Sequence, residues 1–269
     1  MEKPKNNFKI VSDKKARMIL PNAITLIGVC IGLTSIKFAL DGKFAIAVVA
    51  ILFAGLMDAL DGRIARLIKG TSKMGKELDS LGDVISFGVA PAFIMYFWSL
   101  QYLDKLGWFV CLMYVVCVAL RLARFNVNSE EEASWKDNFF EGVPAPAGGI
   151  IVLIPLVLSF SGLEEFLFKI NYDLIVPIFF ITTSILLIST VPTYSFKKIV
   201  IPRAMTKFLL FGIVLFFGAL LVYTFKVLAF SIFLYLCLIP ISYFHYKKIK
   251  KEKNIITNTD EIDDFEDIL

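Results

Sequence analysis

The sequence predicts an all-α protein, a polytopic membrane helix bundle of about eight spans. Two observations support this: the apolar composition, and the length and even spacing of the apolar runs. The chain has 269 residues, 57% hydrophobic and 19% charged, whereas soluble domains are nearer half apolar and a quarter charged. Several runs approach the roughly 20 residues that span a bilayer as helix, and they are too long and continuous for barrel strands.

The apolar runs divide the chain into three parts. A basic segment, 1–19, either lies along the membrane surface as an amphipathic helix or is an ordinary basic flank. A transmembrane domain, 20–246, follows, and then a tail, 247–269, that is basic, then acidic, and predicted to be disordered. The fifth and sixth spans are short and contain prolines, so the sequence is also compatible with a count that differs by one or two. The expected spans are 20–40, 44–67, 78–100, 108–124, 147–161, 174–190, 208–225 and 227–243.

The distribution of basic residues predicts the orientation. Most of the 28 Lys and Arg residues fall before the first span, in the second, fourth and sixth loops, and after the last span. By the positive-inside rule, both termini are expected in the cytoplasm of a cell whose inner or plasma membrane holds the protein. The net charge of +4 is too small to indicate nucleic-acid binding. All four cysteines lie inside apolar runs without a CxxC pair, and the single histidine, His245, follows the last run. Zinc, disulfide and histidine chemistry are therefore not indicated.

Four aspartates lie beside the second and third apolar runs. Asp58 and Asp61 are three residues apart, and Asp79 and Asp83 are four apart, so each pair shares one face of a helix. The first pair lies near the cytoplasmic end of the second span and the second pair at the start of the third. Two antiparallel helices therefore bring both pairs together at the cytoplasmic interface.

Such a group of acids needs positive charge. Each carboxylate inside a span costs roughly 2.5–3.5 kcal/mol, and the spans contain no matching set of arginines. Two Mg²⁺ or Mn²⁺ ions would supply the charge and prefer oxygen ligands. A pair of such ions roughly 3.5–4 Å apart suits displacement at phosphorus. The alternative is a solvated, charged loop between two spans.

Residues around the aspartates extend this pattern. Gly62 and Ala65 leave room for a planar group or a close backbone approach, and Arg66 lies one helical turn beyond Gly62, where it could reach a phosphate. The pattern D-x2-D-G-x2-A-R-x8-G-x3-D-x3-D resembles the signature of the CDP-alcohol phosphotransferases. Its fixed positions are Asp58, Asp61, Gly62, Ala65, Arg66, Gly75, Asp79 and Asp83.

The resemblance implies a fold and a reaction. The family has a six-helix core, and in it an alcohol attacks the β-phosphoryl group of a CDP-linked lipid and CMP leaves. By resemblance, Asp58, Asp61 and Asp79 bind one metal ion, and Asp58, Asp79 and Asp83 bind the other. Asp83 is then the base that takes the hydroxyl proton.

Four further segments resemble the integral-membrane phosphatidylserine synthase branch of the family: PNAIT (21–25), RLARFNV (121–127), FEGVPAPAGG (140–149) and PTYSFKK (192–198). The resemblance implies CDP-diacylglycerol and L-serine as substrates, phosphatidylserine and CMP as products, and a homodimer. It also places Asn22 and Thr25, with Gly62, Ala65, Arg66 and Gly75, near the nucleotide and diphosphate. A plain helix-capping role for Asn22 and Thr25 is the alternative.

Polar residues after the fourth span suit serine as the acceptor. Arg121 and Arg124 are three apart at the depth of the aspartates and could clamp a carboxylate, while Asn126 could accept a hydrogen bond from the ammonium group. The arginines are alternatively anchors of the span. Lys197 and Lys198 either hold a lipid phosphate or only follow the positive-inside rule.

The sequence leaves three other functions as alternatives. A sibling enzyme would use glycerol 3-phosphate, inositol phosphate or another alcohol, or an archaeal-type lipid donor. A divalent-cation transporter would place its acids near the bilayer midplane, whereas these lie at one interface. A non-catalytic scaffold would not need this set of fixed residues. The acceptor alcohol, the metal, the dimer surface and the role of the tail are not determined by the sequence.

Overall fold

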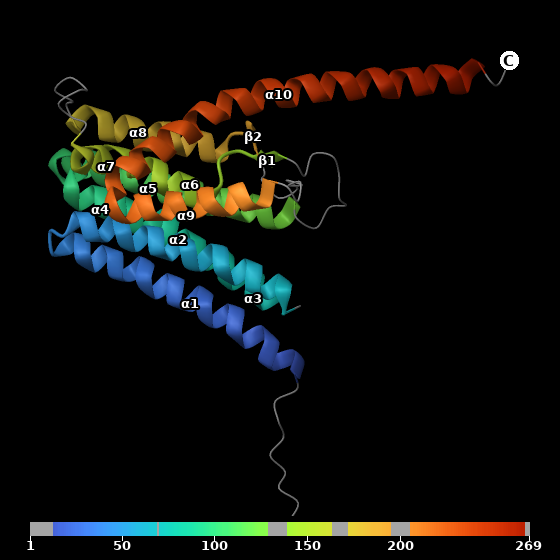
Figure 1. Ribbon diagram of the computed structural model, residues 1–269. Helices are drawn as coiled ribbons and strands as arrows, with labels where there is room; N and C mark the ends of the chain where they lie inside the picture. The colour runs from blue at the N-terminus through green and yellow to red at the C-terminus, as the bar shows by residue number, and fades with distance from the viewer. Residues whose placement is uncertain (1–12, 69, 129–138, 163–171, 195–204, 267–269) are drawn as a thin grey trace, which may run out of the picture.

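The computed structural model describes residues 13–266, apart from 69, 129–138, 163–171 and 195–204. This part of the chain is a helical bundle with one small two-stranded sheet (Figure 1). The predicted helical class and membrane character are confirmed, because five helical segments are long and apolar enough to cross a bilayer. They are Ile19–Leu40, Phe44–Leu67, Lys73–Trp98, Leu100–Val127 and Thr224–Ile249.

Five such segments are fewer than the eight predicted spans. The sixth and seventh predicted spans correspond to shorter apolar helices, Leu174–Ile188 and Thr206–Val222. The fifth is broken into two eight-residue helices, α6 (Ala145–Val152) and α7 (Ile154–Ser161). Pro155 lies just after the break, where its missing N–H and its ring are incompatible with a continuous helix.

The first two helices form an antiparallel pair. α1 (Asp13–Leu40) and α2 (Phe44–Leu67) are joined by a tight turn in which Gly42 has a φ of +73°. Glycines bring α1 close to its neighbours: a Cβ on Gly28 would lie 3.4 Å from Met57 Cβ, and one on Gly32 would lie 2.7 Å from Ser86 Oγ. Small residues permit such close approach of membrane helices. α1 therefore supports both segments that carry the aspartates.

The third span changes its helical geometry part-way. α3 (Lys73–Asp83) begins at Ser72, whose hydroxyl accepts a hydrogen bond from the Gly75 N–H at 2.9 Å. The π-helix η1 (Val84–Val89) follows directly after Asp83, and α4 (Ala90–Trp98) completes the span. A π-helix shifts the backbone bonding pattern and often occurs at a functional site. Here it follows the last aspartate.

The next helix stabilises this π-helix. The 3₁₀ turn η2 (Leu100–Leu103) leads into α5 (Asp104–Asn128). Tyr114 of α5 is fully buried, and its hydroxyl donates a hydrogen bond to the Phe87 carbonyl in η1 at 2.7 Å. A Cβ on Gly149 of α6 would lie 3.0 Å from the same carbonyl oxygen. Elements α5 and α6 thus pack directly on the backbone just after Asp83.

A short two-stranded sheet lies at the same end of the bundle as the α2–α3 turn (Figure 1). β1 (Phe139–Glu141) pairs antiparallel with β2 (Pro192–Tyr194), with Phe140 opposite Thr193. β2 follows α8 (Tyr172–Ile188). Gly142, with a φ of +74°, ends β1, and a Cβ there would lie 2.7 Å from the Ser189 carbonyl oxygen. The sheet joins two of the segments that carry the family resemblance, although about fifty residues separate them in the sequence.

The last two helices lie on the outside of the bundle. α9 (Thr206–Val222) has no buried residue, and α10 (Thr224–Glu266) packs on α7 and β2 before extending beyond the bundle (Figure 1). α10 continues as helix through 247–266, where the sequence indicates a disordered tail. A helix that is already formed lengthens without a new nucleation step, and the lysine-rich first part of this segment, 247–253, has good helix propensity.

Candidate active site

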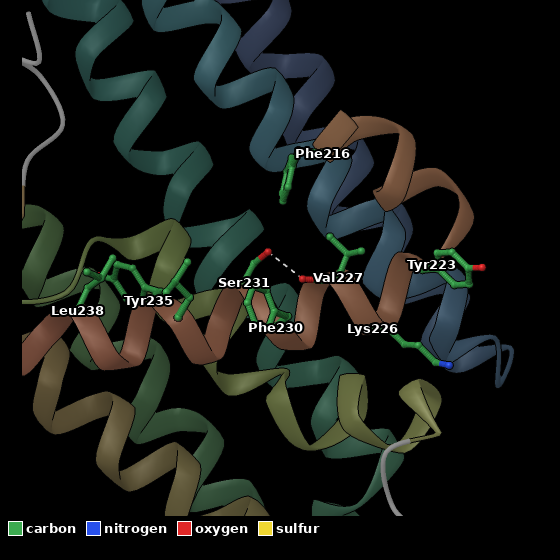
Figure 2. A pocket seen from close by; sticks show the side chains of 9 residues that line it. Phe216, Tyr223, Lys226, Val227, Phe230, Ser231, Tyr235 and Leu238 are labelled. Atoms are coloured by element: carbon green, nitrogen blue, oxygen red, sulfur yellow. Dashed lines mark hydrogen bonds between the residues drawn. The ribbon is translucent and has the colours of Figure 1, made fainter. Parts of the chain in front are cut away.

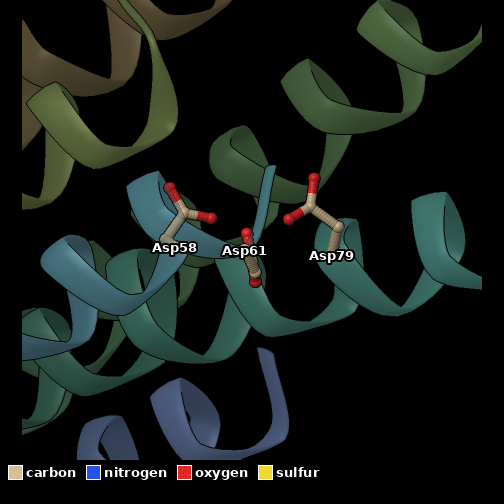
Figure 3. Close-up of side chains that lie close together, drawn as sticks. All are labelled: Asp58, Asp61 and Asp79. Atoms are coloured by element: carbon tan, nitrogen blue, oxygen red, sulfur yellow. The ribbon is translucent and has the colours of Figure 1, made fainter. Parts of the chain in front are cut away.

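The acidic residues of α2 and α3 meet where these helices face one another. One carboxylate oxygen each from Asp58, Asp61 and Asp79 lies within 4.8 Å of the other two. Figure 3 shows the three side chains converging from the two helices. The pairing of α2 with α3 therefore brings three of the four predicted aspartates together, and these three are the residues that the resemblance implies for the first metal ion.

Asp83 adjoins this cluster without being part of its compact group. Its carboxyl group interacts with that of Asp58, and its Oδ1 atom is buried without a hydrogen-bond partner among the described residues. Buried polar atoms nearly always have a partner. Asp83 is therefore set back from the other three, with an oxygen open to a proton or a cation.

The position of Asp61 is fixed by α1. Thr25 donates a hydrogen bond from Oγ1 to Asp61 Oδ2 at 2.5 Å, with the Pro21 carbonyl oxygen 3.1 Å away as an alternative acceptor. Asp61 is buried, with 3% of its surface exposed. Sequence reasoning placed Thr25 near the nucleotide but did not predict that it orients a carboxylate. Helix pairing between α1 and α2 was the missing information.

The donor set fits a hard divalent cation. All the converging ligands are carboxylate oxygens, the type that Mg²⁺ and Mn²⁺ prefer. In the described part of the chain, the only salt bridge is between Lys37 and Asp41, at the far end of α1. The charge of the cluster is thus not neutralised by a salt bridge among these residues, and a divalent cation would offset it.

A cleft of about 530 Å³ opens beside the cluster, between α1, α2 and the start of α3. Among the described residues, no atom lies within 4 Å of a Cβ placed on Gly62, whereas a Cβ on Gly75 would lie 2.9 Å from Asn22 Oδ1. Arg66 donates from Nε to the Gly62 carbonyl at 3.0 Å. The structure therefore brings together all the residues predicted to contact the nucleotide and diphosphate: Asn22, Thr25, Gly62, Ala65, Arg66 and Gly75.

The cleft also contains residues that sequence reasoning missed. Ser72, Lys73 and Lys76 line it beside the predicted set. The sequence does contain a signal for them. A serine, Ser72, precedes the helix that carries Asp79, and Lys73 and Lys76 lie in its first turn. A helix start of this kind favours anionic groups through its free N–H groups and its dipole.

A family model described as CDP-alcohol phosphatidyltransferase matches residues 18–192. The chain belongs to the CDP-alcohol phosphatidyltransferase family. It is 38% identical over 229 residues to a CDP-diacylglycerol–serine O-phosphatidyltransferase of Mycobacterium tuberculosis, covering 82% of this chain and 77% of the relative. It is 34% identical over 183 residues to the Helicobacter pylori protein of the same name, covering 67% and 74%. The Bacillus subtilis protein of that name is 34% identical over 142 residues, covering 53% and 76%.

The residues predicted to hold serine differ in their surroundings in this CDP-alcohol phosphatidyltransferase. Arg124 donates to the Ile188 carbonyl at 2.8 Å, and the Asn126 side-chain amide donates to Ser80 Oγ at 2.9 Å. Arg121 is buried, with 7% of its surface exposed, and its Nε has no partner among the described residues. Arg124 and Asn126 therefore tie α5 to α8 and α3. Lys197 and Lys198 lie outside the described residues.

Proposed function

We propose that this CDP-alcohol phosphatidyltransferase transfers the phosphatidyl group of CDP-diacylglycerol to the hydroxyl of L-serine, giving phosphatidylserine and CMP. The observation that carries the proposal is the convergence of Asp58, Asp61 and Asp79 at one side of the 530 Å³ cleft. The relatives named as serine phosphatidyltransferases support the choice of donor and acceptor.

The aspartates would hold two divalent ions, Mg²⁺ or Mn²⁺. Asp58, Asp61 and Asp79 would hold one, and Asp58, Asp79 and Asp83 the other. When bound, such ions neutralise the negative charge on the diphosphate oxygens. Asp58 and Asp79 would serve both ions, which agrees with their positions on facing helices.

The protein's own groups would bind and align the substrates. Arg66 and the lysines at the start of α3 would attract the diphosphate, and the absence of a side chain at Gly62 leaves the cleft open to the nucleotide. Asp83 would accept the proton of the serine hydroxyl while the serine hydroxyl oxygen forms a bond to the β-phosphorus. The bond from that phosphorus to the CMP oxygen breaks, and CMP leaves with the electron pair.

The buried guanidinium of Arg121 would bind the carboxylate of serine. Burial excludes water and strengthens a charge-assisted hydrogen bond. Arg124 and Asn126 would keep α5 in place, since their side chains already contact Ile188 and Ser80. Lys197 and Lys198 are proposed as contacts to a lipid phosphate.

The membrane arrangement is proposed from charge and helix direction. The start of α1, the α2–α3 turn and the small sheet lie at one end of the bundle (Figure 1). Basic residues cluster at this end in the sequence, which supports a cytoplasmic active site. Eight membrane segments, both termini in the cytoplasm, and a homodimer complete the proposal.

A substrate panel tests the function. The purified protein in vesicles, with CDP-diacylglycerol and Mg²⁺ or Mn²⁺, is given L-serine, glycerol 3-phosphate or inositol phosphate, and CMP release is measured. We expect release with serine and none after metal chelation. Release only with a phosphorylated alcohol would assign a sibling reaction, and divalent-ion flux without CMP release would indicate a transporter.

The role of Asp83 as base is tested separately. Asp83→Asn should lower turnover by about 10²–10⁴-fold while the protein still inserts in the membrane. Asp41→Asn, at the far end of α1, is the matched control and should retain full activity. Normal CMP release by the Asp83 variant would exclude it as the proton acceptor.

A further inference from the structure

Three buried polar atoms from three different helices have no hydrogen-bond partner among the described residues. They are Asp83 Oδ1 on α3, Arg121 Nε on α5 and the Tyr235 hydroxyl on α10. The Arg121 side chain lies within electrostatic range of both Asp83 and Tyr235. Only one other such atom occurs among the described residues, Ser242 Oγ. Because unpartnered buried polar atoms are rare, their grouping around one arginine indicates a place for a polar ligand.

Tyr235 is held rigidly at this place. α10 packs on β2, and the Tyr235 hydroxyl lies near Thr193, whose own hydroxyl donates to the Gly142 carbonyl at 2.8 Å. The Tyr235 ring packs against a buried apolar cluster that includes Val143 and Ile232. A packed ring keeps its hydroxyl in one position, so the hydroxyl can bind a ligand with little loss of side-chain entropy.

The other side of Tyr235 is apolar. It lines a cavity of about 510 Å³ between α9 and α10, which runs from Tyr223 and Lys226 at one end to Tyr235 and Leu238 at the other (Figure 2). Tyr235 therefore separates this apolar cavity from the polar atoms around Arg121. A tyrosine suits such a boundary because its ring is apolar and its hydroxyl is polar.

The neighbouring polar side chains leave Arg121 and Tyr235 available. Arg124 and Asn126 already bond to Ile188 and Ser80. A carboxylate placed between Arg121 and Tyr235 would accept hydrogen bonds from both, and its charge would balance the buried guanidinium. The neighbouring Asp83 would then lie next to the rest of the same small molecule.

We propose that Tyr235 is a specificity residue that forms, with Arg121, the subsite for the carboxylate of the acceptor alcohol. This inference rests on the proposed function, in which the acceptor is serine. Tyr235 lies beyond residues 18–192, the region matched by the family model. The family region supplies the aspartates, and α10 supplies a contact that selects the acceptor.

The test compares Tyr235→Phe with wild-type protein in vesicles, using L-serine and L-serinamide, which lacks the carboxylate. Loss of one hydrogen bond to a charged group should raise the KM for serine about 10- to 100-fold. The KM for CDP-diacylglycerol and the turnover of serinamide should change by no more than about twofold. Tyr243→Phe, at an exposed position of α10, is the matched control and should behave as wild type.

The outcomes separate the subsite from the function. An unchanged serine KM in Tyr235→Phe, in a wild-type protein that does use serine, overturns the subsite and leaves the function intact. An equal loss with serine and serinamide, together with a lower melting temperature, shows a structural role and also overturns it. Wild-type protein that releases CMP with another alcohol but not with serine overturns the proposed function itself.

Discussion

The two sides of the candidate site are built in different ways. The aspartates come from α2 and α3, which are consecutive and antiparallel, and residues 58–83 contain all four. The acceptor side combines α5 with α10, and more than a hundred residues separate Arg121 from Tyr235. The first arrangement lies wholly inside the region matched by the family model, and the second extends beyond it.

This difference indicates a division of labour. Every reaction of the family uses a CDP-linked donor, so the aspartate side has to bind a CDP group that does not vary between members. The acceptor varies, and a helix outside the matched region can change without disturbing α2 and α3. Substitutions on the aspartate side should therefore affect all acceptors equally, whereas those on the acceptor side should affect only acceptors with the right charged group.

The largest effect is expected at Asp79. Asp79→Asn removes one carboxylate from the cluster within 4.8 Å, which weakens cation binding and the alignment of the diphosphate. CMP release should fall by about 10³-fold or more with every acceptor. Measuring release with serine and serinamide checks this. A loss confined to serine would contradict the proposed division between the two sides.

Arg121→Lys should produce the next largest effect, limited to the acceptor. Lysine keeps the charge but loses the planar donors that bind a carboxylate. The KM for serine should rise about 10- to 100-fold, with the KM for CDP-diacylglycerol little changed. Steady-state kinetics with both substrates varied measures the two constants. Arg124→Lys is the control, because Arg124 donates to a backbone carbonyl, an acceptor that lysine can also reach. A shared rise in both KM values would indicate that Arg121 supports the whole site.

The contrast between the two sides also explains what the sequence could predict. Helical spacing is a local property, so it predicted that Asp58 and Asp61 share one helix face, and the structure places both in the group that Asp79 completes. The β1–β2 pair has three residues per strand and joins Phe140 to Thr193, which is too short and too distant to leave a periodic signal. The roles of Thr25 and Tyr235 depend on which helices pack together, and local sequence does not specify that. For the same reason, Arg121, Arg124 and Asn126 formed one predicted group, although among the described residues only Arg121 of these three has a buried donor without a partner.

Substitution of Gly62 should have a smaller effect, limited to the KM for CDP-diacylglycerol. A Cβ there would meet no atom of the described residues within 4 Å, so Gly62→Ala should keep the fold and stabilise α2 by about 0.5–1 kcal/mol. The added methyl group projects into the cleft, so the KM for CDP-diacylglycerol should rise about tenfold, with the KM for serine unchanged. Thermal unfolding in detergent and kinetics measure the two effects. Unchanged donor KM would show that the nucleotide does not approach Gly62.

The smallest effect is expected at Tyr114, which joins the two sides. Its hydroxyl on α5 bonds to the Phe87 carbonyl in the π-helix after Asp83. Tyr114→Phe removes this bond and should destabilise the protein by about 1 kcal/mol. Because Arg121 and Asp83 lie on the two segments that the bond connects, turnover should fall by about two- to fivefold, equally for serine and serinamide. Tyr102→Phe, at an exposed tyrosine, controls for the substitution. If Tyr114→Phe altered the KM for serine alone, α5 would be adjusting the acceptor subsite independently of the aspartates, and the two sides would be mechanically separate.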